Sequence, residues 1–283
     1  MRARRRLSGL AVAGAAAALA LALPGAATAD DAGSVTASGG AVQATLSWEA
    51  AELGVKNPRL VVTRAGATLY DGSPVGDPDT CAEGCVFAGT GTAAPLKVVD
   101  LDGDGEPEVV VAAFTGGAHC CVLSEIWHFT GATYARVETD WGSLGYDLKD
   151  LDGDGRPELS GYDFAFEDAF TSHAASFEPP LVLDYDPTQK SGFRDVTRNF
   201  PALVRKNASQ ALRTLRRAKR EHGETLGIVA AYVGDLYLLG RGREVRPYLH
   251  RARKRGDLRT ISGRAPRSFD AQLLKFLHKA GYR

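Results

Sequence analysis

Apolar and polar residues alternate in the first regular part of the chain. In AVQATLSW, every second residue from Val42 to Trp48 is apolar, which is the period of a half-buried strand. Residues 58 to 72 carry strand patterns on both sides of a turn at Gly66, so we expect a hairpin of LVVT and ATLY there. The preceding residues 30 to 40 are rich in Gly, Ala and Ser, and we expect them to be a loose leader.

Two later segments share one order of strand patterns. Residues 96 to 145 run as LKVVDL, an Asp-rich loop, EVVVAAF, a GGAHCC segment and a hairpin of SEIWHF and TGATYARVE. Residues 146 to 198 run as YDLKDL, a second Asp-rich loop, ELSGYDFAF, a longer polar stretch, LVLDY and GFRDVT. The loops begin at Asp100 and Asp150, which is a blade-sized period of about 50 residues. We therefore predict two internal repeats.

From residue 199 onward the apolar spacing is that of helices. FPALVRKNASQALRTLRRAKREHG has apolar residues along one side and stops at Gly223. TLGIVAAYVGDLYLLG is apolar nearly all round and predicts a buried central helix. EVRPYLHRARKRG and FDAQLLKFLHKAG predict two more amphipathic helices.

The predicted fold class is α+β. We expect a mostly antiparallel β domain with blade-like hairpins over residues 30 to 198, followed by a small α-helical bundle over residues 199 to 283. Propellers typically have four to eight blades, and residues 30 to 198 are too few for a ring of blades this size. We therefore favour a small open sheet or sandwich formed with the N-terminal strands, and keep a fragment of a propeller as the alternative.

Residues 1 to 29 have the three parts of a signal peptide: an Arg-rich start, the apolar run LAVAGAAAALALAL, and a small-residue cleavage site ending at Ala29. Either the Sec or the twin-arginine route fits the Arg run. No later apolar run approaches the length of a membrane span. We expect an exported, soluble protein, secreted from the cell.

Charge divides the remaining chain into two parts. Residues 30 to 198 hold 10 Lys and Arg against 28 Asp and Glu, whereas residues 199 to 283 hold 20 against 6, although the whole chain is formally neutral. The basic helices could bind an anionic surface or polymer, or pack beside the acidic part of the same chain. Nucleic acid is not the partner we expect, and the physiological partner stays open.

The strongest chemical signal is the pair of loops VVDLDGDGEPEVV and KDLDGDGRPELSG. Carboxylates fall on every second residue and would repel each other unless a hard cation neutralised them; calcium takes 6–8 oxygens from such a flexible loop. We expect two calcium ions in a structural role, against the alternative of solvated acidic turns without metal. The expected ligands are the side chains of Asp100, Asp102, Asp104 and Glu108 with the carbonyl of Glu106, and the side chains of Asp150, Asp152, Asp154 and Glu158 with the carbonyl of Arg156.

The residues that follow the aspartates indicate which kind of calcium loop this is. An EF-hand needs a Glu at its twelfth position, where this chain has Val111 and Gly161. The loops instead resemble the VCBS/FG-GAP repeat of secreted and integrin-type β-propeller blades, in which a D-x-D-G-D-G-x-x-D loop lies between two strands. The resemblance covers about residues 96 to 198. The family pattern ends in Asp where this chain has Glu108 and Glu158.

Four cysteines in an exported chain favour disulfides. They are Cys81, Cys85, Cys120 and Cys121. Of the three connectivities, we prefer the two that tie the CAEGC loop to the HCC strand, because a bond between adjacent cysteines closes a strained ring. A zinc site or a Cys–His nucleophile that includes His119 is the alternative; the spacings do not match a CxxC pair, and oxidised sulfurs cannot attack.

The function we favour is a calcium-binding, non-catalytic binding protein. The rival is a secreted hydrolase that acts on a cell-wall or glycan substrate through residues 162 to 178. This loop contains residue types that can act as an acid and base, namely Glu167, Asp168, His173 and Glu178. No spacing links them into a recognisable active site, so a solvated loop is favoured over the hydrolase, although long loops often carry function.

Overall fold

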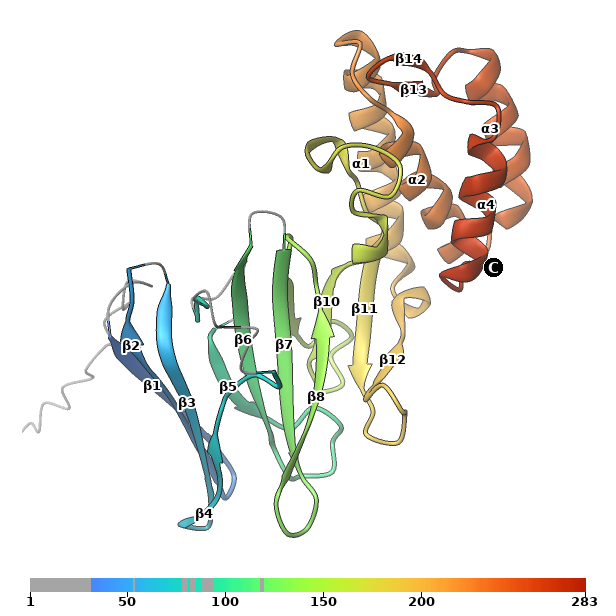
Figure 1. The fold of residues 1–283 in the computed structure, drawn as a ribbon. Coiled ribbons are helices and arrows are strands. Elements are labelled where there is room, and N and C mark those ends of the chain that lie inside the picture. Colours follow the sequence, from blue (N-terminus) through green and yellow to red (C-terminus); the bar gives the residue numbers. More distant parts are fainter. Residues whose placement is uncertain (1–31, 53, 78–80, 82–84, 88–93, 118–119) are drawn as a thin grey trace, which may run out of the picture.

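The computed structural model describes residues 32–283 apart from 53, 78–80, 82–84, 88–93 and 118–119. The described strands form three four-stranded sheets and one two-stranded hairpin, and four α-helices follow the sheets (Figure 1). The predicted α+β class is therefore correct. The predicted signal peptide, residues 1 to 29, lies outside the described residues.

The first sheet contains the predicted strand and hairpin. Its strands are β1 (Gly33–Gly39), β2 (Val42–Ala50), β3 (Val55–Arg64) and β4 (Ala67–Gly72), each antiparallel to the one before. The prediction of a loose leader over residues 30 to 40 is wrong, since β1 pairs with β2 along its whole length. Backbone hydrogen bonds to β2 order this segment, which its small side chains alone would not do.

The second and third sheets lie in the two segments, 96 to 145 and 146 to 198, for which repeats are predicted. The second consists of β5 (Leu96–Val99), β6 (Glu108–Gly117), β7 (Cys120–Phe129) and β8 (Tyr134–Asp140). The third consists of β9 (Tyr146–Lys149), β10 (Glu158–Tyr162), β11 (Pro180–Tyr185) and β12 (Phe193–Asp195). In both, neighbouring strands are consecutive in the chain, and each Asp-rich loop joins the first strand to the second.

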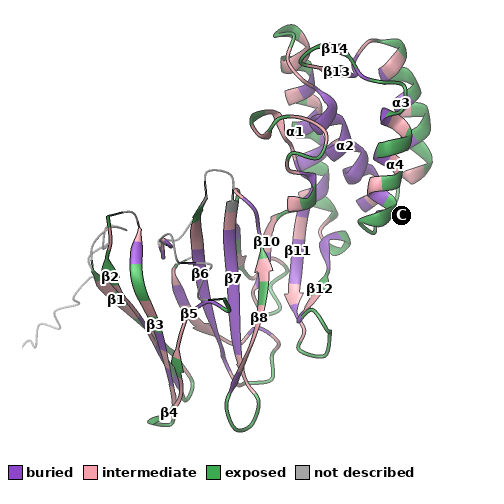
Figure 2. Cartoon of the chain, viewed as in Figure 1, coloured by how far each residue is buried: buried purple, intermediate pink, exposed green. Residues whose placement is uncertain are grey.

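The three sheets stack face to face, and β6 shows why. Its Val109 and Val111 belong to a core shared with the first sheet, whereas Val110 and Ala112 belong to a core shared with the third. Both faces of the strand are buried (Figure 2), which explains its uninterrupted apolar run. The favoured open sheet or sandwich is therefore wrong: the N-terminal strands form a sheet of their own, and the sheets stack one after another.

The helical part has its own core. Its helices are α1 (Pro201–Arg220), α2 (Leu226–Leu238), α3 (Val245–Lys254) and α4 (Phe269–Lys279), and α2 is buried on nearly every side, as its composition predicts. Short 3₁₀ turns lie at Phe164–Phe166, His173–Ala175, Thr197–Asn199 and Gly242–Glu244. A small hairpin of β13 (Arg259–Thr260) and β14 (Gly263–Arg264), which the sequence did not predict, precedes α4. None of the described helices is long and apolar enough to cross a lipid bilayer.

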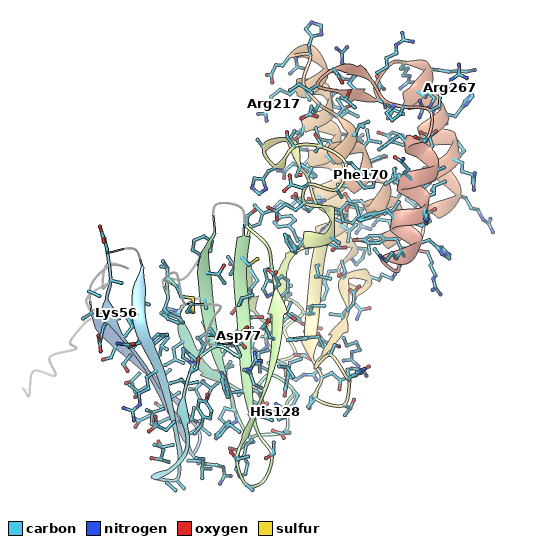
Figure 3. All side chains as sticks on the ribbon, viewed as in Figure 1. Lys56, Asp77, His128, Phe170, Arg217 and Arg267 are labelled. Atoms are coloured by element: carbon cyan, nitrogen blue, oxygen red, sulfur yellow. A yellow bond between two sulfur atoms is a disulfide. The ribbon has the colours of Figure 1, made fainter. Side chains whose placement is uncertain are left out.

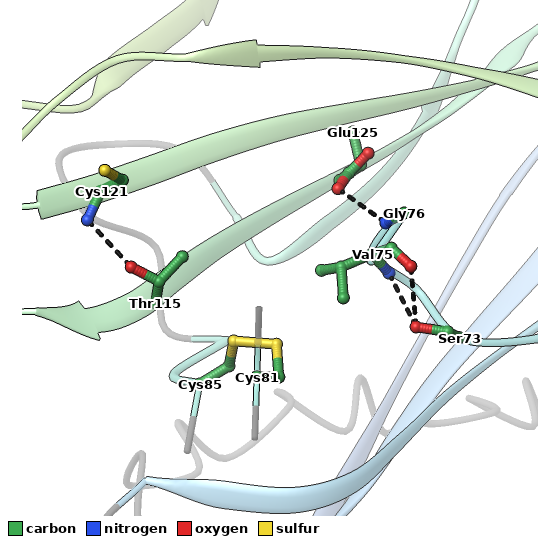
Figure 4. Close-up of a disulfide and its surroundings, with 8 residues drawn as sticks. All are labelled: Ser73, Val75, Gly76, Cys81, Cys85, Thr115, Cys121 and Glu125. Carbon is green, nitrogen blue, oxygen red and sulfur yellow. Dashed lines mark hydrogen bonds between the residues drawn. A yellow bond between two sulfur atoms is a disulfide. The ribbon is translucent and has the colours of Figure 1, made fainter. Parts of the chain in front are cut away.

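The cysteines correct a further expectation. Cys81 pairs with Cys85 (Figure 4), so the preferred cross-link between the CAEGC loop and the HCC strand is wrong. Backbone hydrogen bonds attach this segment to β3 and β6 instead: Val55 N donates to Cys85 O (2.8 Å), and Val86 N donates to Phe114 O (2.8 Å). Cys121 is disulfide-bonded as well. The side chains of His119 and Cys120 lie outside the described residues, and no described cysteine is free for zinc or for nucleophilic attack.

A candidate metal site in two matching loops

The first Asp-rich loop folds around the carboxylate of Asp100. Oδ1 of Asp100 accepts from Gly103 N (2.7 Å), and its Oδ2 accepts from Gly105 N (3.0 Å). Both glycines have φ in the left-handed region, at 82° and 86°, where a Cβ is disfavoured. The two glycines therefore let the loop bring two amide donors onto one carboxylate.

The other carboxylates of this loop converge on the same place. Oδ1 of Asp102 accepts from Asp104 N (3.1 Å), and Oε2 of Glu108 accepts from Leu101 N (2.8 Å). One oxygen each from Asp100, Asp102 and Glu108 lies within 4.8 Å of the others. Three of the expected side-chain ligands are thus within reach of one ion, and Asp104 lies next to them in the chain.

Glu108 has the most unusual electrostatic environment in the loop. The residue is 3% exposed. Burial, and then the negative charges of the neighbouring aspartates, raise the pKa of Glu108 to about 8. Arg64, a basic residue beside the loop, binds Glu106 instead, with hydrogen bonds of 2.8 and 2.7 Å. Among the described residues no ion pair includes Glu108, so a bound cation would supply the missing positive charge.

The second loop repeats the hydrogen bonds between backbone amides and carboxylates of the first. Asp150 accepts from Gly153 N (2.7 Å) and Gly155 N (3.0 Å), as Asp100 does in the first loop. Oε2 of Glu158 accepts from Leu151 N (2.7 Å), and burial raises the pKa of Glu158. A second group of oxygens within 4.8 Å of one another comes from Asp150, Asp152 and Asp154.

Arg156 distinguishes the second loop from the first. Its guanidinium binds Asp154, with an Nε to Oδ2 distance of 2.9 Å, so one carboxylate of this loop already faces a cation. A cavity of about 40 Å³ lies beside it, lined in part by Asp152, Glu158 and Asp184. This volume exceeds what one water molecule needs. Asp184 was not predicted, because it lies on β11 and reaches the loop only through the pairing of strands.

All the atoms in both loops that are expected to coordinate a metal are oxygens, which fits a hard cation such as calcium better than zinc or copper. Backbone amides hold the carboxylates of Asp100, Asp102 and Glu108 in place, and one oxygen of each lies within 4.8 Å of the others. The chemistry of the residues therefore fits the metal that the sequence predicts. An ion at either loop would join the first strand of a sheet to the second.

The loop of residues 162 to 178 gathers titratable groups that sequence spacing did not link. Nδ1 of His173 lies 2.8 Å from Oε1 of Glu167 and 3.5 Å from Oδ2 of Asp168. Burial, and then the charge of Glu167, raise the pKa of nearby Glu178 to about 7. The 3₁₀ turns at Phe164–Phe166 and His173–Ala175 fold the segment back on itself, and no local periodicity predicts that fold.

Comparison with known proteins supports the resemblance of the loops. Residues 100–159 match the model of the FG-GAP-like repeat, which spans both Asp-rich loops. The chain is 30% identical over 140 residues to an uncharacterised protein of Sinorhizobium fredii, and 30% identical over 158 residues to a protein of Synechocystis named as a probable thylakoid lumen protein.

These relatives are similar in part only. The matched segments are 48% and 52% of this chain, and they cover 21% and 44% of the relatives' own lengths. The chain therefore spans less than half of either relative. No solved structure gives a significant match.

Proposed function

We propose that this chain is an exported, non-catalytic binding protein whose two Asp-rich loops each hold a calcium ion in a structural role. The observation that carries the calcium proposal is Glu108, a buried carboxyl that faces two aspartates and forms no ion pair in the described chain. A buried carboxylate without a positive charge beside it is costly, and a divalent cation would remove that cost.

The expected ligands keep the roles that the sequence assigns to them. Asp100, Asp102 and Glu108 would bind from the first loop together with Asp104 and the carbonyl of Glu106. The corresponding residues of the second loop, including the carbonyl of Arg156, would bind a second ion. Extracellular modules bind calcium at about 10⁻⁴ to 10⁻³ M, so a tenfold excess of calcium would stabilise the fold by about 1.4 kcal/mol per site.

Three observations support export. A signal-like segment begins the chain, a disulfide forms between Cys81 and Cys85, and one relative is named as a probable lumen protein. Disulfides persist mainly in oxidising compartments.

We also propose that residues 30 to 198 and 199 to 283 are separate domains, because the helices have a hydrophobic core distinct from those of the sheets.

Calorimetric titration of the mature protein with calcium, combined with thermal melting, tests the calcium proposal. We expect binding heat and a rise in melting temperature. Two double variants, Asp102→Asn with Glu108→Gln and Asp152→Asn with Glu158→Gln, should each lose one site. The exposed Glu52→Gln is the matched control and should keep both sites. The absence of heat and of any calcium-dependent stabilisation would overturn the proposal.

The hydrolase remains a second candidate because His173 contacts Glu167, which is 5% exposed at its side chain. A buried carboxylate can orient an imidazole for acid–base chemistry. A screen of cell-wall and glycan substrates tests this candidate. Activity that disappears in His173→Ala and Glu167→Gln would support it, and a screen without turnover would count against it.

A further inference from the structure

The hairpin of β13 and β14 lies at the end of the helices far from the sheets (Figure 1). An exposed apolar side chain stands on this hairpin. The strands β13 and β14 pair Arg259 with Arg264, and Ile261 lies in the turn between them. Ile261 is 88% exposed, the highest value among the exposed large hydrophobic residues, whereas Leu144 is 53% exposed. Such a side chain contributes nothing to the core of the helices.

The hairpin is anchored firmly to the helices. Leu258 and Ala265, on either side of it, are buried in the helical core, and Ala265 N donates to Leu258 O (3.0 Å). Oγ1 of Thr225, just before α2, donates to Asp257 O (2.7 Å) and accepts from Arg259 N (2.8 Å). The turn therefore projects from a fixed base, and the exposure of Ile261 follows from the fold.

Basic residues surround this hairpin. The exposed ones come from the last turns of α1, the end of α3 and the segment before α4. We call these residues together with Ile261 the hairpin face; they are Arg216, Arg217, Arg220, Arg255, Arg264 and Arg267. Figure 3 shows Arg217 and Arg267 at this end of the molecule. None of the six arginines forms an ion pair with any other described residue.

The acidic residues at this end do not neutralise the hairpin face. Asp257 forms an ion pair with Lys219, and Asp270 forms one with Arg253 (2.6 Å). Oε2 of Glu224 accepts from the hydroxyl of Ser172 (2.7 Å), and the same carboxylate also interacts with the backbone of Ile261. Glu221 is exposed at the end of α1. These two carboxylates offset only part of the charge of the six arginines, so net positive charge remains on the hairpin face.

Two simpler explanations account for only part of this pattern. Basic residues favour the C-terminal ends of helices because of the helix dipole, which explains Arg217 and Arg220 but not Arg264 or Arg267. Packing against the acidic sheets of the same chain would also use basic charge, but the hairpin lies at the opposite end of the helices from the sheets (Figure 1). Neither explanation accounts for Ile261.

We propose that the hairpin face docks on an anionic lipid surface, with Ile261 entering the boundary between headgroups and acyl chains and the arginines contacting lipid phosphates. Acidic wall polymers offer negative charge without an apolar layer, and the bases of a nucleic acid duplex are stacked beneath its phosphates. A lipid surface offers both anionic headgroups and a continuous apolar layer for Ile261. This inference deepens the proposed binding role by naming a partner, and it does not depend on calcium.

Sedimentation with vesicles tests the proposal. The mature protein should bind vesicles of phosphatidylcholine mixed with phosphatidylglycerol, should bind more weakly as salt rises, and should not bind phosphatidylcholine alone. Ile261→Ser should weaken binding about tenfold. Arg264→Gln and Arg267→Gln should each weaken it about fivefold. Because all three side chains are exposed, the three variants should have the same melting temperature as the unaltered protein.

Matched controls come from other parts of the surface. Leu144→Ser removes an exposed apolar side chain from the sheets, and Arg205→Gln removes an exposed charge from the other end of α1. Neither should change vesicle binding. If arginine variants weaken vesicle binding while Ile261→Ser does not, charge alone carries the binding and the proposal that Ile261 enters the lipid is wrong. Equal binding to both kinds of vesicle also overturns the proposal.

The assays are run with calcium and with a chelator, so that the two proposals fail separately. Vesicle binding that persists in the chelator, together with no calcium heat, would overturn only the calcium proposal. Calcium heat without any vesicle binding would overturn only the docking proposal.

Discussion

Nη1 of Arg156 lies 3.5 Å from the carbonyl oxygen of Asp102, so the second Asp-rich loop touches the first. The same guanidinium binds Asp154. Cδ of Arg156 also lies 2.9 Å from the place that a Cβ would take at Gly103. One side chain thus neutralises a carboxylate of its own loop and packs against its neighbour.

This contact predicts unequal calcium sites. Arg156→Gln keeps the backbone carbonyl but removes the charge that competes with an ion at Asp154. Because the ion pair is exposed to solvent, its contribution is small, so we expect the calcium affinity of the second loop to rise by no more than about fivefold. Calorimetry on this variant, with Asp102→Asn added to remove the first site, measures the effect. An unchanged or weaker second site would contradict the prediction.

A buried carboxyl in the helices predicts a pH dependence of stability. Asp235 lies on α2, is fully buried and accepts from Nδ2 of Asn207 at 3.1 Å. Burial raises the pKa of Asp235 to about 8 from an ordinary value of 3.8. The folded state therefore holds this proton more tightly than the unfolded state does, and the stabilisation present below about pH 4 is lost as pH rises towards 8.

Asp235→Asn should remove this dependence, because the amide is neutral at every pH and nearly the same shape. We expect the variant to be more stable than the unaltered protein at pH 9 by a few kcal/mol, with a much smaller difference at pH 4. Urea unfolding at the two pH values measures the free energies. The exposed Glu221→Gln is the control, and a D235N curve parallel to that of the unaltered protein would refute the assignment.

Gly76, in the loop after the first sheet, has no room for a side chain beside Arg136. A Cβ at Gly76 would lie 1.8 Å from Nη2 of Arg136. Nη1 of Arg136 lies 2.5 Å from Oε2 of Glu125, whose side chain is fully buried. Gly76→Ala should displace the guanidinium and weaken its ion pair with Glu125, which keeps the hydrogen bond from the backbone N of residue 76 (3.3 Å). Because the guanidinium is the end of a flexible side chain, we expect a cost of about 1 kcal/mol.

The matched control is Gly223→Ala, because a Cβ there has no neighbour nearer than 3.6 Å. Chemical unfolding of both variants measures the difference. If Gly76→Ala is no less stable than Gly223→Ala, then Arg136 moves without loss of its ion pair and the argument is wrong.

The pairing of Cys81 with Cys85 predicts that reducing this disulfide lowers the stability of the fold only modestly. The bond closes a loop of only a few residues, for which the chain-entropy model gives about 2 kcal/mol. Replacing both cysteines with Ser should lower the free energy of unfolding by that amount. Mass spectrometry of the non-reduced protein after digestion between the two cysteine regions checks the pairing itself. A peptide from residue 81 or 85 linked to one containing Cys121 would contradict it.

The local elements of this protein follow from the sequence alone. Alternation predicts β2, because side chains in a strand point to opposite faces in turn. Runs of β-branched and apolar residues between turn residues predict the β3–β4 hairpin and the strands of the two later sheets. Apolar stripes predict the four helices for the corresponding reason. The D-x-D-G-D-G spacing identifies both candidate metal loops, since glycines at Gly103 and Gly105 permit the backbone to turn around Asp100.

Only the tertiary structure decides what these elements do together. The stacking of three sheets buries both faces of β6, and it pairs an N-terminal segment of small residues into β1. The contact between His173 and Glu167 depends on a folded loop, and the exposure of Ile261 depends on the burial of Leu258 and Ala265 beside it. Periodicity describes each residue relative to its near neighbours in the chain, whereas these contacts depend on packing between segments distant in sequence, which no local pattern specifies.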